Sequence, residues 1–139
     1  MADSTVTGQG TEQDPWILKT PPGKSEYLMY RDDEAEPPAL VCVVGKTKLS
    51  YQARCLEDLT AMLKENGGWM LLGSTDEQKE PKEGTVEAWG RSTNNPVGGW
   101  YGLRKGFRGR FANYVPPLME HLELAELEHK GRNNSMRAR

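Results

Sequence analysis

Cysteine and histidine are scarce in this sequence, with two residues of each among 139. Cys42 lies in an apolar run and Cys55 on the apolar side of a predicted helix, so we interpret both as buried thiols rather than nucleophiles. Two cysteines are also too few for a disulfide scaffold. His121 and His129 are far apart and have no cysteine nearby, which is not a metal-ligand spacing. We therefore expect no cofactor, no metal and no catalytic residue, and we favour a non-enzymatic protein over an enzyme.

Long apolar runs are absent as well. No segment approaches the roughly 20 apolar residues that cross a bilayer. The first residues, Met1–Thr5, do not have the charged-then-apolar layout of a signal peptide. These two absences predict a soluble, cytoplasmic protein without a membrane partner.

The net charge is small, −2, but its distribution along the chain is uneven. Residues 1–99 carry 10 Lys and Arg against 16 Asp and Glu, whereas residues 100–139 carry 8 against 4. An acidic body with a basic end can attract an anionic partner at one face. The alternative is that the two halves of the chain pair their charges with each other in the fold.

The pattern of apolar residues predicts an α+β fold for a single domain, residues 14–139, after a disordered polar tail, residues 1–13. A helix that packs on the sheet is predicted over Gln52–Asn66, where leucine and methionine recur at helical spacing before two glycines. Three segments before it have the composition of strands in an antiparallel meander: Ser25–Arg31, Ala39–Val44 and Thr47–Tyr51.

The C-terminal half is expected to be richer in helix. Thr85 is placed to cap a helix, and Pro116 suits the first position of another, where a missing N–H costs nothing. Residues 124–139 fit either a hairpin or a frayed end. The predicted elements are a strand at Trp69–Leu72, a helical turn at Ser74–Glu77, and helices at Val86–Ser92, Phe107–Tyr114 and Pro116–Leu122.

One stretch, Gly98–Phe111, differs from the rest: it has five glycines, four cations and four aromatic residues, and no acid. Cationic side chains neutralise phosphates, aromatic rings stack on bases, and glycines let a backbone approach a ligand closely. We therefore predict that this stretch, with the Arg-rich C-terminus, binds an anionic partner, with nucleic acid the first choice. The candidate binding residues are Trp100, Tyr101, Arg104, Lys105, Arg108, Arg110, Arg132 and Arg137.

Other interpretations of the same stretch remain open. Its aromatic residues can belong to the core and its cations to a solvated or paired face. Arg and aromatic residues are also enriched at the centres of protein interfaces, so Trp100 is a candidate anchor for a protein partner or a homodimer. A further hypothesis makes Gly98–Gly102 the mobile rim of a small-molecule pocket, which predicts a deep apolar cavity beside it.

The predicted element order after residue 52 resembles that of a winged helix, with a helix, a strand, two more helices and a hairpin with a basic tip. Leu122–Glu126 followed by Lys130–Asn134 is similar to the passage into the wing in MarR-type DNA-binding regulators. The sequence departs from that family at Glu123, where its members usually have glycine, and in the lack of Arg or Lys within Pro116–Leu122. The resemblance therefore implies DNA contacts from residues 104–110, Arg132, Arg137 and Arg139.

Four short motifs together resemble a family of small uncharacterised bacterial proteins, a domain of unknown function. They are Thr20–Gly23, Gly84–Gly90, Asn95–Gly102 and Arg132–Asn134. The resemblance covers the chain from about residue 14 to its end. It implies a compact cytoplasmic domain, and it implies no activity.

Overall fold

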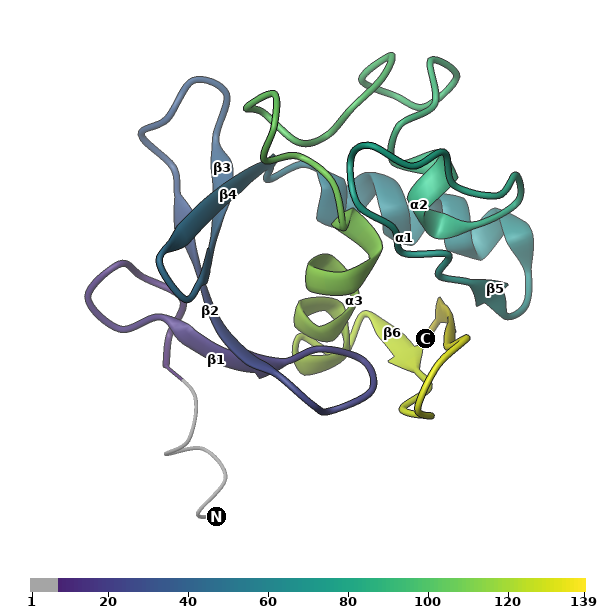
Figure 1. Ribbon diagram of the computed structural model, residues 1–139, viewed down its shortest axis with the longest axis horizontal. Coiled ribbons are helices and arrows are strands. Elements are labelled where there is room, and N and C mark those ends of the chain that lie inside the picture. Colours follow the sequence, from purple (N-terminus) through teal and green to yellow (C-terminus); the bar gives the residue numbers. More distant parts are fainter. Residues whose placement is uncertain (1–7) are drawn as a thin grey trace.

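The structure, a computed structural model, describes residues 8–139 and contains a larger and a smaller antiparallel sheet together with helices (Figure 1). The larger sheet has the strand order β1-β2-β3-β4. The predicted α+β class and the meander are confirmed, and β1 pairs with β2 as a further strand that the sequence pattern did not indicate. The strands are β1 Trp16–Lys19, β2 Glu26–Asp32, β3 Ala39–Val44 and β4 Thr47–Gln52.

The predicted disordered tail, residues 1–13, lies partly outside the described residues. Of its members, residues 8–13 are held to the sheet: the Gly10 N–H donates to Asp14 O, and Gly10 O accepts from the Arg31 N–H. Gly10 has φ +88°, and a Cβ there would stand 2.2 Å from the Trp16 ring. The ordered chain therefore begins before the predicted boundary at residue 14, because the Gly10 backbone packs directly against Trp16.

Helix α1, Cys55–Asn66, begins three residues later than predicted because β4 extends to Gln52. It ends where the sequence indicates: Gly67 has φ +76°, and its N–H donates to Leu63 O. Its apolar side buries Cys55, Leu59 and Leu63 in the core. The predicted helix is thus confirmed, with its stop supplied by a residue that tolerates the left-handed conformation.

The smaller sheet joins the C-terminal hairpin to the strand that follows α1. Its order is β5-β7-β6, from β5 Met70–Leu71, β6 Ala125–Leu127 and β7 Ser135–Ala138. The segment 124–139 is therefore a hairpin in the structure. Buried Ala125, Leu127 and Met136 connect this sheet to the same apolar core as the larger one.

Helix α3, Phe111–His121, runs through the middle of the molecule, between the larger sheet and the layer formed by α1, α2 and β6 (Figure 1). The prediction of two helices divided before Pro116 is wrong, because Pro116 and Pro117 lie inside this one helix. Residues 107–110 are not helical, since Arg110 has the left-handed φ of +60°. Burial of Tyr114, Val115, Leu118 and Met119 compensates for the backbone hydrogen bonds that proline cannot make.

The segment between β5 and α3 contains one short helix and long loops. Helix α2, Val86–Trp89, is shorter than predicted, but its cap is confirmed: the Thr85 hydroxyl accepts from the Ala88 N–H at 3.2 Å. The predicted helical turn at Ser74–Glu77 is absent, and Asp76 instead closes a turn by accepting from the Gln78 N–H. The loops between α2 and α3 lie at the end of the molecule away from the N-terminus (Figure 1).

Candidate functional site

The Gly98–Phe111 stretch connects α2 to α3 and is fixed at its beginning by a buried asparagine. The Asn95 amide donates to Trp89 O and Gly99 O, and its oxygen accepts from the N–H groups of Val97 and Gly99. The next residues extend the larger sheet, because the Gln52 N–H donates to Tyr101 O and the Leu103 N–H to Ser50 O. These bonds hold the segment that the pocket hypothesis treats as a mobile rim.

Tyr101, one of the candidate binding residues, belongs to the core. Its side chain is 0% exposed, and its ring stacks on Trp89 and Phe111 at centroid distances of 5.2 and 5.5 Å. The hydroxyl donates to Asp58 Oδ2 at 2.8 Å. A base cannot reach either face of this ring, so Tyr101 is removed from the candidate site.

Trp100 is partly buried and holds two guanidinium groups against its ring. Arg91 and Arg108 lie 4.5 and 4.2 Å from the ring centroid, within the range of cation–π attraction. The Nε atom of Arg108 is buried without a hydrogen-bond partner, and Glu77 Oε1 lies 3.6 Å from it. Glu77 also accepts from the N–H groups of Gly106 and Arg108. Although partial desolvation opposes them, these bonds hold the pKa of Glu77 below its usual value.

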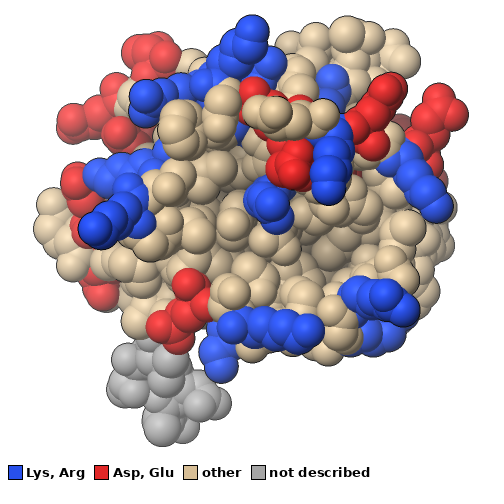
Figure 2. Space-filling model, in the orientation of Figure 1, with Lys and Arg blue, Asp and Glu red and all other residues tan. Residues whose placement is uncertain are grey.

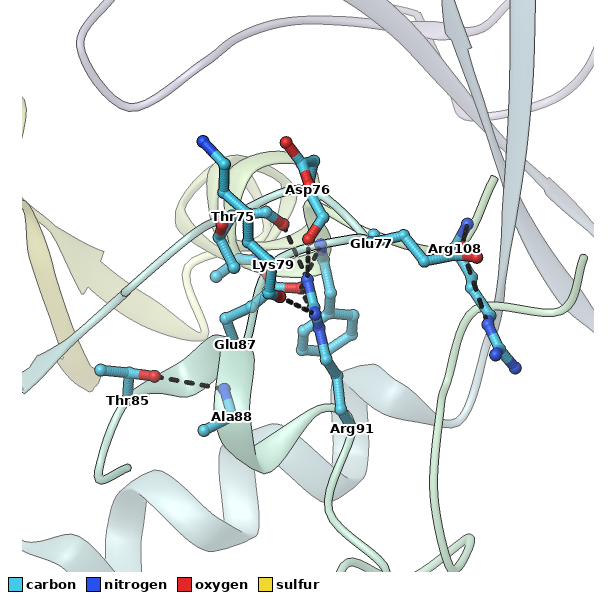
Figure 3. Close-up of polar contacts among 12 residues, drawn as sticks. Thr75, Asp76, Glu77, Lys79, Thr85, Glu87, Ala88, Arg91 and Arg108 are labelled. Carbon is cyan, nitrogen blue, oxygen red and sulfur yellow. Dashed lines mark hydrogen bonds and ion pairs between the residues drawn. The ribbon is translucent and has the colours of Figure 1, made fainter. Parts of the chain in front are cut away.

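A buried ion pair lies beneath this loop. Figure 3 shows the Arg91 guanidinium pointing into a group of oxygen atoms, where it pairs with Glu87 at 2.8 Å and donates to the carbonyls of Thr75, Asp76 and Lys79. Glu87 is 0% exposed and also accepts from the N–H of Ala112, in the first turn of α3. Desolvation raises the pKa of the Glu87 carboxyl, and the hydrogen bonds from Ala112 and Arg91 oppose that rise.

The remaining cations of the stretch are solvent-exposed. Within residues 8–139, Arg104, Lys105 and Arg110 form no ion pair, and the Arg104 guanidinium lies 4.7 Å from the centroid of the half-buried Phe107 ring. Figure 2 shows blue and red side chains interspersed over the upper part of the face in view, where Figure 1 places these loops. The basic stretch is thus divided between paired and unpaired cations.

Of the two C-terminal candidate residues, Arg137 is paired with a carboxylate and Arg132 is not, within the described part of the chain. Arg137 on β7 pairs with Glu126 at 2.6 Å and lies over the Trp69 ring. Arg132, in the turn of the hairpin, is exposed and has no ion-pair partner among residues 8–139. The structure therefore brings Trp100 and Arg108 together and leaves Arg132 on a separate element, 32 positions from Trp100 in sequence.

A groove of about 790 Å³ opens beside Trp100, and we call it the Trp100 groove. Its apolar walls come from α1, β5, the loop before α2, α2 itself and the glycine-rich stretch. Lys79, Glu80 and Glu83 stand at its exposed rim. The apolar residues that line it are Met62, Met70, Pro81, Ala88, Trp89 and Trp100.

The sequence pattern missed the residues that hold this groove together. Glu87 and Arg91 are four positions apart in a predicted helix, and this i,i+4 spacing of opposite charges was the available signal. Glu77 gave no comparable signal, since its partners Gly106 and Arg108 lie far along the chain. The Glu87–Arg91 pair and Glu77 each connect segments that are distant in sequence and that only the tertiary structure brings together.

Two further kinds of candidate site are reactive cysteines and clusters of metal ligands. Cys42 and Cys55 are free and buried, and burial raises the pKa of both thiols. Residues 8–139 contain no cluster of histidine, cysteine, aspartate or glutamate that could hold a metal ion. None of their helices is long and apolar enough to cross a membrane.

Comparison with known proteins gives one match. Residues 8–139 match the model of a family described as a family of unknown function, DUF6855. No curated protein and no solved structure matches the chain. Since the match covers nearly the whole sequence, the chain belongs to the DUF6855 family of unknown function.

Proposed function

We propose that this protein binds a small, apolar, ring-containing molecule in the Trp100 groove. The observation that carries the proposal is the groove itself, because its volume of about 790 Å³ and its apolar walls are those of a small-molecule site. The pocket hypothesis predicts such a cavity beside Gly98–Gly102. The groove departs from that hypothesis in two respects: of Gly98–Gly102 only Trp100 lines it, and Asn95 fixes this segment with four hydrogen bonds.

The charges around the groove favour a neutral or cationic ligand over an anion. Arg91 is neutralised by Glu87, and Glu77 by Arg108, so neither pair offers a free charge to a ligand. What remains at the rim is one lysine, Lys79, and two glutamates, Glu80 and Glu83. A net negative rim repels anions and attracts cations.

The test uses three probes that share one ring system and differ in charge: indole, tryptamine and indole-3-acetate. Titration is followed by NMR at the indole N–H groups of the four tryptophans. We expect shifts at Trp89 and Trp100, no shift at Trp16 or Trp69, and weakest binding for indole-3-acetate. Equal shifts at all four indoles would contradict the proposal.

A pair of variants separates the groove from the rest of the surface. Ala88→Phe fills the groove from α2, whereas Ala61→Phe places the same ring on the exposed side of α1, outside the groove. Binding should fall at least tenfold in the first variant and remain within twofold in the second. Similar losses in both variants would show that the probes bind elsewhere.

Nucleic-acid binding is our second candidate function, favoured by one observation. Arg104, Lys105 and Arg110 are exposed and unpaired within residues 8–139, they lie within seven positions of one another on a glycine-rich loop, and Arg104 lies over the Phe107 ring. We expect their triple alanine variant to weaken duplex and single-strand binding at every sequence and to lower the salt dependence by about 0.9 per lost duplex contact. Anisotropy titrations at two salt concentrations measure both effects. Lys46, Lys48 and Lys64, mutated together, give the matched control.

The winged-helix resemblance enters as part of this second candidate. The element order α1, β5, α2, α3, β6, β7 supports it. The burial of Val115, Leu118 and Met119 leaves α3 enclosed, which argues against its insertion into the major groove. DNA contacts would then come from the exposed loop cations and Arg132.

Three proposals remain: self-association through Trp100, a bacterial origin and a cytoplasmic location. Free, buried cysteines support a reducing compartment. Sedimentation velocity at several concentrations tests the homodimer, and Trp100→Ala should abolish any dimer formed there. A constant monomer mass would exclude it.

A further inference from the structure

A second hollow, which we call the hairpin pocket, lies on the side of the molecule formed by the turns of two hairpins. It has a volume of about 290 Å³ and shares no lining residue with the Trp100 groove. One wall is the β1–β2 turn with Pro22, another is Ser74 after β5, and the third is the β6–β7 turn with Gly131, Arg132 and Asn133.

The hairpin pocket is distinguished by the absence of acid from its walls. Four other hollows in residues 8–139 each contain at least one carboxylate, as expected of a chain with 20 Asp and Glu. Here Arg132 is the only charged lining residue. The nearby carboxylates of the hairpin are engaged, Glu128 with Lys130 and Glu126 with Arg137. Figure 2 shows cations along the lower right edge, where Figure 1 places this hairpin.

The turn that carries Arg132 is held in place from within. The buried Asn134 side chain accepts from the Lys130 N–H at 2.6 Å and donates to Lys130 O at 3.0 Å, which closes the turn. Asn134 O accepts from the Leu72 N–H, so the turn is also joined to β5. The backbone of the turn is therefore in place before any ligand arrives, which reduces the entropy cost of ordering it on binding.

Hydrogen-bond donors in this pocket are left without protein partners. Within residues 8–139, the Arg132 guanidinium, the Ser74 hydroxyl and the backbone N–H groups of residues 131–133 make no hydrogen bond. Asn133 has the left-handed φ of +57°, a backbone arrangement that is common where successive N–H groups bind an anion. A guanidinium fork, a hydroxyl and free N–H groups are donors that suit a phosphate group.

We infer that the hairpin pocket binds a phosphate group, with Arg132 as its principal ligand and Ser74 as a second donor. The volume accommodates a phosphate with a small organic substituent. The phosphate can belong to a free metabolite-sized monoester or to a nucleic-acid backbone, because the donor set is the same for both. This inference does not depend on the Trp100 groove.

The experiment is a backbone NMR titration of the full chain with inorganic phosphate, phenyl phosphate and a short DNA duplex. We expect the two small phosphates to shift the N–H resonances of Ser74 and residues 131–133. Arg132→Ala should weaken binding at least tenfold, and Ser74→Ala several-fold. Arg137→Ala is the matched control, because it removes the same charge from the same hairpin outside the pocket, and it should change the affinity less than twofold.

The outcomes separate the sources of the phosphate. A monoester site is indicated if phenyl phosphate binds more tightly than inorganic phosphate and the duplex does not compete with it. A backbone contact is indicated if the duplex shifts the same resonances and Arg132→Ala lowers its affinity. Equal weakening by Arg132→Ala and Arg137→Ala, or shifts spread over all exposed cations, would overturn the inference.

Discussion

Replacing Arg91 with methionine is expected to destabilise the fold strongly, because it removes one partner of a buried ion pair. The Arg91 side chain is 9% exposed and Glu87 is 0% exposed. Methionine keeps the apolar stem of the side chain but removes every hydrogen bond of the guanidinium. Glu87 then retains only backbone N–H donors, and three carbonyls of the loop before α2 lose the hydrogen bond from the guanidinium, although Thr75 O and Asp76 O each keep a backbone donor.

The magnitude follows from the cost of leaving a buried charge without its counter-ion. Removing one partner of such a pair costs about 3–5 kcal/mol. Since small domains have a free energy of unfolding of about 5–15 kcal/mol, the variant should remain folded but lose a large fraction of its stability. For a chain of this length, we expect the melting temperature to fall by about 10 °C or more.

The loss should depend on pH, with a sign set by Glu87. Desolvation already raises the pKa of this carboxyl in the folded state, and the loss of Arg91 raises it further. A group of this kind contributes stability below its unfolded pKa of about 4.3 that is lost as the pH rises through the folded pKa. The penalty of Arg91→Met should therefore be smallest near pH 4 and should increase toward pH 7.

Urea unfolding of the wild-type chain and the variant at both pH values measures this difference. Arg54→Met is the control, because Arg54 forms the same i,i+4 pair with Asp58, but with a side chain that is 53% exposed. We expect its midpoint to stay close to that of the wild type. A penalty for Arg91→Met that equals the control, or that is the same at both pH values, would refute the argument.

Three further predictions concern Tyr101, His129 and the two cysteines. Tyr101→Phe removes the hydrogen bond to Asp58 and should lower the free energy of unfolding by about 1–2 kcal/mol in urea, without changing oligonucleotide affinity. Partial burial lowers the pKa of His129, but its contacts with Glu120 and Pro21 O outweigh this effect and raise the pKa above its usual value. The stability that protonated His129 contributes is therefore lost as the pH rises through that pKa. An NMR titration of the Glu120→Gln variant should give a lower pKa for His129 than in the wild type. Both cysteines should resist a thiol reagent until the chain unfolds; rapid labelling of the native protein would contradict their burial.

The larger sheet could be predicted because its strands carry local signals. Alternation in β2 and a continuous apolar run in β3 are visible in short windows of sequence, and the turn at Gly45 lies between β3 and β4. Strand β1 has no such signal. Its four residues form a strand because they pair with β2, with Trp16 opposite Met29. This pairing depends on the fold and not on the local sequence.

The prediction for helix α3 was wrong for the opposite reason: proline gave a strong local signal for a helix boundary, but tertiary packing outweighed it. Proline inside a helix removes a hydrogen bond and costs about 3 kcal/mol, so Pro116 predicts a boundary. The structure accepts two prolines because Phe111, Val115 and Leu118 are almost completely buried around them. Fully burying a large apolar side chain contributes about 1.5–3 kcal/mol, and several such residues outweigh the local cost.

Composition was enough to single out the stretch 98–111 as a candidate site, but it could not show which groups its side chains contact. Aromatic and cationic residues within 98–111 look alike in sequence, whether they face a ligand or the core. The fold distinguishes them through groups outside the stretch: Asp58 binds the Tyr101 hydroxyl, and Glu77 engages Arg108. The open alternative that acidic and basic halves pair with each other therefore holds for some cations of the stretch and fails for others.

That division bears on which function the stretch can perform. A nucleic-acid platform needs rings with free faces and cations without counter-ions, and Trp100, Tyr101 and Arg108 supply neither. The same contacts fix Trp100 at the end of an apolar groove, where a ring held in one position is an advantage for a small ligand. The cations left over lie farther along the loop and on the hairpin, and their free charge favours phosphate. We therefore assign Trp100 to the proposed small-ligand groove, and we assign the unpaired cations, which lie on both sides of the paired Arg108 in sequence, to the proposed phosphate contacts.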